Sequence, residues 1–148
     1  MNIADKTAIE NLLFRYARYV DTAKYAELGK LFANAKVTAN KHDGVISGEH
    51  EVREYWKMSN KRFEDGTPRT HHVVTNLEFE SLGDNGPVKL SSCFTVFQAT
   101  DKLPLQPIAA GRYHDEFRKT NGEWHFVTKH IEVTMLGDMS HHLNVVLR

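Results

Sequence analysis

The sequence has little with which to cross-link itself: one cysteine, Cys93, in 148 residues. A single cysteine cannot form an internal disulfide, so an apolar core must hold the fold together. Residues 1–8 also lack the apolar run that marks a signal peptide. These absences predict a protein of a reducing compartment, the cytoplasm.

The chain also lacks an excess of either charge, because 19 lysines and arginines balance 19 aspartates and glutamates. Proteins that bind nucleic acid need many basic side chains to neutralise phosphates. A helix that spans a membrane needs about 18 or more consecutive apolar residues, and no such run is present. The expected partner is therefore neither nucleic acid nor a membrane, but a small uncharged molecule or another subunit.

The length fits a single domain over residues 1–148, and no repeat, linker or low-complexity tract divides it. Helical signals come first. The spacing i, i+3, i+4, i+7, i+11 predicts an amphipathic helix, which Asp5 could cap, on the residues Ile9, Leu12, Leu13, Tyr16 and Val20. Shorter helices are predicted over 25–33 and 49–62, and the breaker-rich 41–44 separates Val37 from Val45 and Ile46, which could pair as strands.

The second half of the chain has the alternation of an antiparallel sheet. Strands are predicted over 70–81, 88–100, 108–118 and 123–136, with a turn at 83–87. Asn121-Gly122, between the last two strands, is the strongest hairpin signal in the chain. Helices followed by hairpins predict an α+β domain, in which a cone-shaped, curved antiparallel or mixed sheet packs against three to four N-terminal helices and encloses a pocket.

Nine histidines are the most unusual feature of the composition. Side chains alternate along a strand, so only one of His71 and His72 can enter the pocket. The same alternation places His125 and His130 on different faces, and the chain lacks a His-Glu-x-x-His motif, so no metal is expected. His141 and His142, in the apolar C-terminal end, are expected to be polar groups of a subunit interface.

Asp21 ends the first helix beside Val20, at the margin of the apolar stripe, where its carboxylate would meet the pocket. A buried carboxylate needs a hydrogen-bond partner. A histidine ring could supply one nitrogen to Asp21 and keep the other free to take a proton. Spacing alone favours simpler alternatives, namely that Asp21 caps the following helix and that His72 is a structural histidine.

Six segments, in order, resemble the SnoaL-like branch of the nuclear-transport-factor-2-like superfamily. They are Arg15-Tyr16-Ala17-Arg18-Tyr19-Val20-Asp21, Leu31-Phe32, Gly48, His72-Val73-Val74-Thr75-Asn76, Gly111-Arg112-Tyr113-His114-Asp115 and Gly122-Glu123-Trp124-His125-Phe126. The resemblance covers nearly the whole chain and implies an α+β cone with a deep pocket. Its members include dehydratases, a dehydrochlorinase, cyclases and isomerases, as well as dioxygenase small subunits and binding modules, so the fold does not fix the function.

The resemblance implies roles for particular residues. The catalytic aspartate and histidine of the dehydratase and dehydrochlorinase members fall on Asp21 and His72, and a catalytic tyrosine of bile-acid dehydratase falls on Tyr16. An arginine that steadies the departing anion in the dehydrochlorinase falls on Lys129, which keeps the charge but loses the bidentate fork.

Three more residues are expected to bind substrate. Tyr19 and Tyr113 could donate hydrogen bonds to a substrate oxygen, or they could fill the core. Ile131 follows Lys129 on the same face of its strand.

The function implied by the resemblance is a cofactor-free lyase or isomerase, a dehydratase-like elimination on a small hydrophobic substrate. His72 would take a proton from carbon while Asp21 orients the ring. The competing prediction is a non-catalytic protein, either a ligand-binding module or an assembly subunit like the small subunit of a ring-hydroxylating dioxygenase. In either case a homo-oligomer, dimer or trimer, is expected to form through the sheet face.

Overall fold

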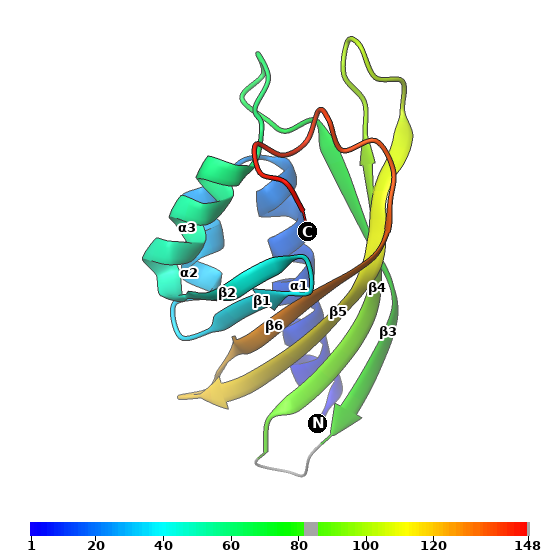
Figure 1. Ribbon diagram of the computed structural model, residues 1–148. Coiled ribbons are helices and arrows are strands. Elements are labelled where there is room, and N and C mark those ends of the chain that lie inside the picture. The colour runs from blue at the N-terminus through cyan, green and yellow to red at the C-terminus, as the bar shows by residue number, and fades with distance from the viewer. Residues whose placement is uncertain (82–85, 148) are drawn as a thin grey trace.

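The computed structural model describes residues 1–81 and 86–147, in which three helices pack against one curved, six-stranded sheet (Figure 1). In chain order the elements are α1 (Ile3–Asp21), α2 (Tyr25–Leu31), β1 (Lys36–Ala39), β2 (His42–Ser47), α3 (Gly48–Ser59), β3 (Thr70–Ser81), β4 (Val88–Gln98), β5 (Gln106–Thr120) and β6 (Glu123–Leu136). The helices lie on the concave face of the sheet (Figure 1). The predicted α+β cone is confirmed.

The sheet is mixed, with the strand order β2-β1-β6-β5-β4-β3. Only β1 and β6 run parallel among the described strand pairs, and the remaining neighbours are antiparallel. The long strands β3 to β6 therefore form a meander, and the short β1–β2 hairpin extends it beside α3. As predicted, Val37 pairs with Ile46 in that hairpin.

The first helix buries the predicted stripe, including Ile9, Leu13 and Val20. Its cap, however, is Asn2 and not Asp5. Asp5 N donates to Asn2 Oδ1 at 2.8 Å, and Asn2 N donates to Asp5 Oδ2 at 3.3 Å, which is a capping box. Asp5 thus supports the helix from inside its first turn, and its carboxylate also accepts a hydrogen bond from Trp124 Nε1 of β6.

Two helices end earlier than their periodicity predicts. The second stops at Leu31 and the third at Ser59, because Asn60 is extended and pairs with Leu143 in an isolated bridge. The predicted turn at Asn121-Gly122 is present, with φ values of 51° and 81° that suit a tight hairpin. Residues 83–85 of the other predicted turn lie outside the described residues.

A bulge in β6 breaks the simple alternation of side chains. Phe117 pairs with Phe126, but Glu116 pairs with Thr128, so Val127 is an extra residue. Phe126 and Lys129 are consequently both buried, although an odd number separates them. The alternation argument that separated His125 from His130 was therefore wrong. Within residues 1–81 and 86–147, no group of three or more His, Cys, Asp or Glu side chains is placed to hold a metal ion.

The C-terminal segment, residues 137–147, crosses the open end of the cone (Figure 1). It is fixed by backbone hydrogen bonds from Gly137 N to Ile108 O (2.7 Å), from Lys61 N to His142 O (2.8 Å) and from Asn144 N to Ser59 O (2.7 Å). The segment therefore joins the sheet to the end of α3. In the described part of the chain, no helix has both the length and the apolar character needed to cross a membrane.

Candidate active site

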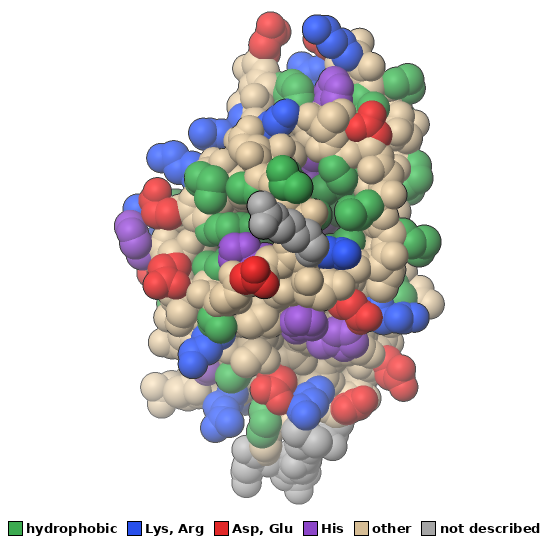
Figure 2. Space-filling model, viewed as in Figure 1, with side chains coloured by type: hydrophobic (Ala, Val, Ile, Leu, Met, Phe, Trp, Pro, Cys, Tyr) green, Lys and Arg blue, Asp and Glu red, His purple; other side chains and the backbone are tan. Residues whose placement is uncertain are grey.

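A cavity of about 140 Å³ lies between α1, α3, the sheet and the C-terminal segment. Its wall is mostly aliphatic and aromatic, with contributions from Val37, Trp56, Phe94 and Val96. An apolar cavity of about 150 Å³ admits benzene, so this one suits a ligand of roughly one ring. Figure 2 shows hydrophobic side chains gathered around the C-terminal segment on this face, with charged side chains and histidines around them.

Asp21 and His72 meet at one side of this cavity. His72 Nδ1 lies 2.5 Å from Asp21 Oδ1, and His72 N donates to Asp21 Oδ2 at 2.9 Å. Thr70 Oγ1 donates to the first carboxylate oxygen at 2.8 Å. The end of α1 is thereby joined to the start of β3, and Asp21 does not cap α2, whose N-cap residue Lys24 makes no side-chain capping bond.

The contact fixes the chemistry of the His72 ring. Because a carboxylate only accepts hydrogen bonds, Nδ1 must carry the proton, and the neutral ring then has its lone pair on Nε2. Burial acts to raise the pKa of Asp21, but the hydrogen bonds from His72 and Thr70 hold that pKa below its ordinary value. His72 lines the cavity, so a base oriented by an anion stands at its wall.

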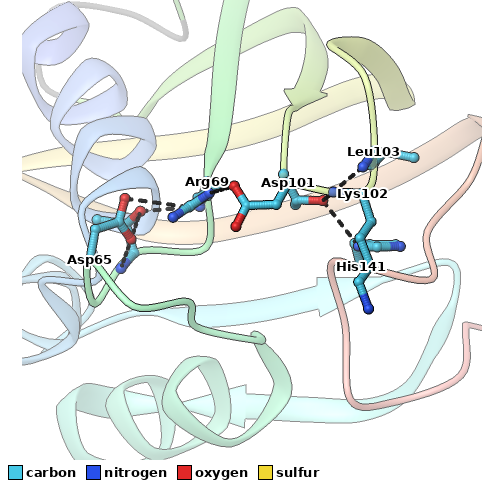
Figure 3. A network of polar contacts seen from close by, with 8 residues as sticks. Asp65, Arg69, Asp101, Lys102, Leu103 and His141 are labelled. Atoms are coloured by element: carbon cyan, nitrogen blue, oxygen red, sulfur yellow. Dashed lines mark hydrogen bonds and ion pairs between the residues drawn. The ribbon is translucent and has the colours of Figure 1, made fainter.

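The start of β3 is held in place from outside the cavity (Figure 3). Arg69, just before Thr70, has a positive φ of 52°. Its guanidinium lies between two carboxylates, with Nη1 3.0 Å from Asp101 Oδ1 and Nε 3.6 Å from Asp65 Oδ2. The loop after α3 and the β4–β5 loop therefore fix the strand that presents His72.

Tyr16 and Tyr113 form the part of the wall next to the dyad. Their rings meet edge to face, with centroids 5.6 Å apart. Both residues line the cavity, and burial raises the pKa of both hydroxyls, so each stays neutral and can donate a hydrogen bond.

Lys129 is not where a leaving-group anchor would be. It is 1% exposed and does not line the cavity. Its Nζ lies 3.2 Å from Asp115 Oδ1, and 3.5 Å and 4.3 Å from the ring centroids of Tyr113 and Tyr16. Burial raises the pKa of Asp115 and lowers that of Lys129, and their mutual attraction opposes both shifts. The buried Asp115–Lys129 pair therefore packs against the rings of Tyr16 and Tyr113.

Of the other residues predicted to bind substrate, two line the cavity and one does not. Ile131 and Tyr113 line the cavity. Tyr19 does not, and it packs half-buried against the core.

Among the cavity residues that sequence reasoning missed is His142. Its side chain is 7% exposed and lines the same cavity as His72, whereas the neighbouring His141 points away and lies 3.2 Å from Thr100 Oγ1. The interface role expected for His142 was therefore wrong. Two adjacent histidines at the end of a chain give no signal by which one of them could be assigned to a pocket.

Comparison with known proteins supports the family resemblance. The SnoaL-like domain matches residues 1–130. Among curated proteins, none matches the sequence significantly.

Solved structures share the fold at low sequence identity. A protein of unknown function with a cystatin-like fold from Nostoc punctiforme is 20% identical, with 90% of this chain and 94% of that chain covered and a TM-score of 0.73. A proposed scytalone dehydratase from Novosphingobium aromaticivorans is 21% identical, with 93% and 89% covered and a TM-score of 0.72. The beta subunit of a proposed aromatic-ring-hydroxylating dioxygenase from the same organism is 15% identical, with 90% and 92% covered and a TM-score of 0.69.

Acid should destabilise the protein through His142. Burial, with a smaller contribution from His72, lowers the pKa of His142 from 6.5 to about 4. The unfolded chain therefore binds the proton more readily than the native state. The contribution of His142 to the free energy of unfolding is present above pH 6.5 and is lost as pH falls to about 4, by roughly 3 kcal/mol.

Urea unfolding of the wild type and His142→Gln, near pH 7.5 and near pH 4, measures this loss. The free energy of unfolding should fall by roughly 3 kcal/mol less in the variant than in the wild type. Equal falls would show that the His142 imidazole does not need to stay neutral in the fold.

Proposed function

Because this chain belongs to the SnoaL-like domain family, we propose that it is a cofactor-free lyase or isomerase that takes a proton from carbon in a small hydrophobic substrate. The observation that carries this proposal is the 2.5 Å contact between His72 Nδ1 and Asp21 Oδ1 at the wall of an apolar cavity. We favour a dehydratase-like elimination, and isomerisation is the other outcome of the same proton abstraction.

In this mechanism His72 is the general base. Its Nε2 takes a proton from a carbon next to an activating carbonyl, and Asp21 stabilises the imidazolium that forms. The Tyr16 hydroxyl donates a hydrogen bond to the carbonyl oxygen as negative charge develops there, and the ring of Tyr113 packs against the ring of Tyr16. No metal or organic cofactor is needed for these steps.

The proposed substrate is neutral and has about one ring. Ile131 and Tyr113 contribute to its binding wall. Lys129 acts only through the tyrosine rings above it, and Tyr19 makes no direct contact. A cytoplasmic location is a further proposal, which rests on the composition alone.

A second candidate is a non-catalytic role in ligand binding or assembly. The structural match to a dioxygenase beta subunit supports it, although at 15% identity that match concerns the fold alone. In this candidate the cavity would bind a ligand without changing it, and the Asp21–His72 contact would be structural. Catalysis by His72 therefore separates the two candidates.

The probe 5-nitrobenzisoxazole tests His72 without knowledge of the natural substrate. It is small, neutral and apolar, and a base opens its ring by removing one proton from carbon to release a coloured phenolate. We expect His72→Ala and Asp21→Ala each to lower the wild-type turnover of this probe by about 10³-fold, because each removes general base catalysis or its support. Absorbance measures the product.

His71→Ala is the matched control, because His71 is the adjacent histidine and is exposed on the opposite face of β3. It should keep wild-type turnover. Circular dichroism should show that all three variants are folded. Equal turnover by His72→Ala and the wild type would remove the enzyme proposal and leave the binding candidate.

The Tyr16 hydroxyl should matter where that of Tyr19 does not. We expect Tyr16→Phe to lower kcat for a ketone substrate of the proposed class, 4-hydroxy-4-phenylbutan-2-one, by about 10²-fold, since it removes one preorganised donor to the developing oxyanion. Tyr19→Phe, three residues along the same helix but outside the cavity, should stay within about twofold of the wild type. A similar loss in both variants would point to helix packing instead.

We also propose that the chain forms a dimer or trimer through its sheet face. Exposed apolar side chains near one end of β5 and β6, Leu105 (73% exposed) and Met135 (66% exposed), are the groups that such a contact would cover. Sedimentation velocity should show an oligomer that Met135→Glu weakens and Met58→Glu, exposed on α3, does not. A monomeric wild type at high concentration would contradict the proposal.

A further inference from the structure

Thr70 contacts the Asp21–His72 pair but has no part in the proposed mechanism. Its hydroxyl Oγ1 donates to Asp21 Oδ1 at 2.8 Å, and the same carboxylate oxygen lies 2.5 Å from His72 Nδ1. The other oxygen, Oδ2, accepts the backbone N–H of His72 at 2.9 Å. Thr70 does not line the cavity, so an effect of its hydroxyl on the reaction passes through Asp21.

The backbone around Thr70 is fixed by contacts that do not involve Asp21. Thr70 pairs with Gln98 of β4 in the sheet. The Gln98 side chain is buried, and its amide donates to Pro68 O at 3.0 Å. Arg69, between Pro68 and Thr70, has a positive φ of 52°, a conformation that is uncommon for a residue other than glycine. The Thr70 hydroxyl is therefore placed by the fold, and little freedom is lost when it donates to the carboxylate.

Asp21 is also accessible to water from outside the cavity. Asp21 and His72 both line a groove at the edge of the sheet, together with the exposed side chains of Phe14, Arg18 and His71. The Asp21 side chain is 16% exposed, against 7% for that of His72. A carboxylate that water reaches can rotate and exchange its partners, and a second fixed donor on Oδ1 opposes that rotation.

The Thr70 hydroxyl also affects where the proton between Asp21 and His72 lies. This proton stays on His72 Nδ1 only if the carboxylate is stable as an anion. Hydrogen bonds to a carboxylate stabilise its charged form. Burial acts to raise the pKa of Asp21, and the Thr70 hydroxyl is one of the groups that lower it. Thr70 therefore favours the arrangement in which Nδ1 is protonated and Nε2 is free to act as the base.

We propose that Thr70 is a positioning residue of the reaction, which holds the Asp21 carboxylate in line with the His72 ring through the hydrogen bond from Oγ1 to Oδ1. This inference rests on the proposed function of His72 as the base. Thr70 contacts no substrate, and it stabilises the ion pair that forms when His72 takes a proton. Loss of the hydroxyl should therefore slow the chemical step and leave substrate binding unchanged.

Variants of Thr70 separate the hydroxyl from the rest of the side chain. With 5-nitrobenzisoxazole, Thr70→Val should lower kcat about tenfold and keep KM within about twofold of the wild type, because one hydrogen bond to a charged group is lost. Thr70→Ser keeps the hydroxyl and should recover most of the loss. Thr95→Val is the matched control, because Thr95 is half-buried on the opposite face of the neighbouring strand β4, and it should keep wild-type turnover.

A double-mutant cycle distinguishes positioning from packing. In the Asp21→Ala background, Thr70→Val should change kcat by no more than about twofold, since the carboxylate on which the hydroxyl acts is absent. A tenfold loss in that background, or no loss in Thr70→Val alone, would overturn the proposal.

An NMR measurement tests the hydrogen bond without any substrate. The wild type should show a downfield proton signal from His72 Nδ1 that is absent from His72→Ala. In Thr70→Val this signal should move and exchange faster with water, whereas in Thr70→Ser it should stay. An unchanged signal in Thr70→Val would overturn the role of Thr70. If the valine variant does not fold, Thr70→Ala takes its place in both measurements.

The two measurements also separate this proposal from the proposed function. Benzisoxazole turnover that does not depend on His72 would overturn the proposed function. The NMR comparison of the wild type with Thr70→Val would still decide whether the Thr70 hydroxyl positions the Asp21–His72 pair.

Discussion

The Asp21 carboxylate is the point on which the rest of the site depends. It ends α1 and accepts three hydrogen bonds, all of them from Thr70 and His72 at the start of β3. Because β3 is the outermost strand of the sheet, no further strand lies beyond it to hold it. The contact therefore does two things at once: it fastens the sheet edge to the first helix, and it sets the tautomer of the base. A partly buried carboxylate is stable there only because all three partners are donors.

A second pair of opposite charges, Asp115 and Lys129, stabilises the core and does not line the cavity. Asp115 and Lys129 are almost fully buried, and the Lys129 ammonium lies over the ring of Tyr113. Removing one member of such a pair leaves an unpaired buried charge, which typically costs about 3–5 kcal/mol. The pair is therefore part of the core. The Lys129 ammonium contacts the Asp115 carboxylate and the rings of Tyr16 and Tyr113. Lys129 keeps a positive charge at this position but does not line the cavity.

The order of the elements could be predicted from the sequence, since helical spacing, strand alternation and the Asn121-Gly122 turn are local signals. The pairing of Asp21 with His72 was implied only by the family resemblance, because spacing alone favoured a helix cap for Asp21 and a structural role for His72. What could not be predicted depends on register and on distant contacts. A two-residue hairpin alone would place Thr128 opposite Asp115, and only the extra residue at Val127 brings Lys129 there. His142 reaches the cavity next to Leu143, which forms a bridge with Asn60, 83 residues away from Leu143 in the chain, and no local pattern encodes such a crossing.

The charges of the site also bear on the neutral substrate that we propose. Of the described residues that line the cavity, Lys41 alone has a fixed charge, and it lies on the turn between β1 and β2, while Asp21 reaches the cavity only through His72. Proton abstraction turns Asp21 and His72 into an ion pair of zero net charge, which favours the protonated ring in a medium of low dielectric. The tyrosines and His142 are kept neutral by burial and can only donate or accept hydrogen bonds. A neutral carbonyl compound would develop its charge only in the transition state, where Tyr16 could stabilise it.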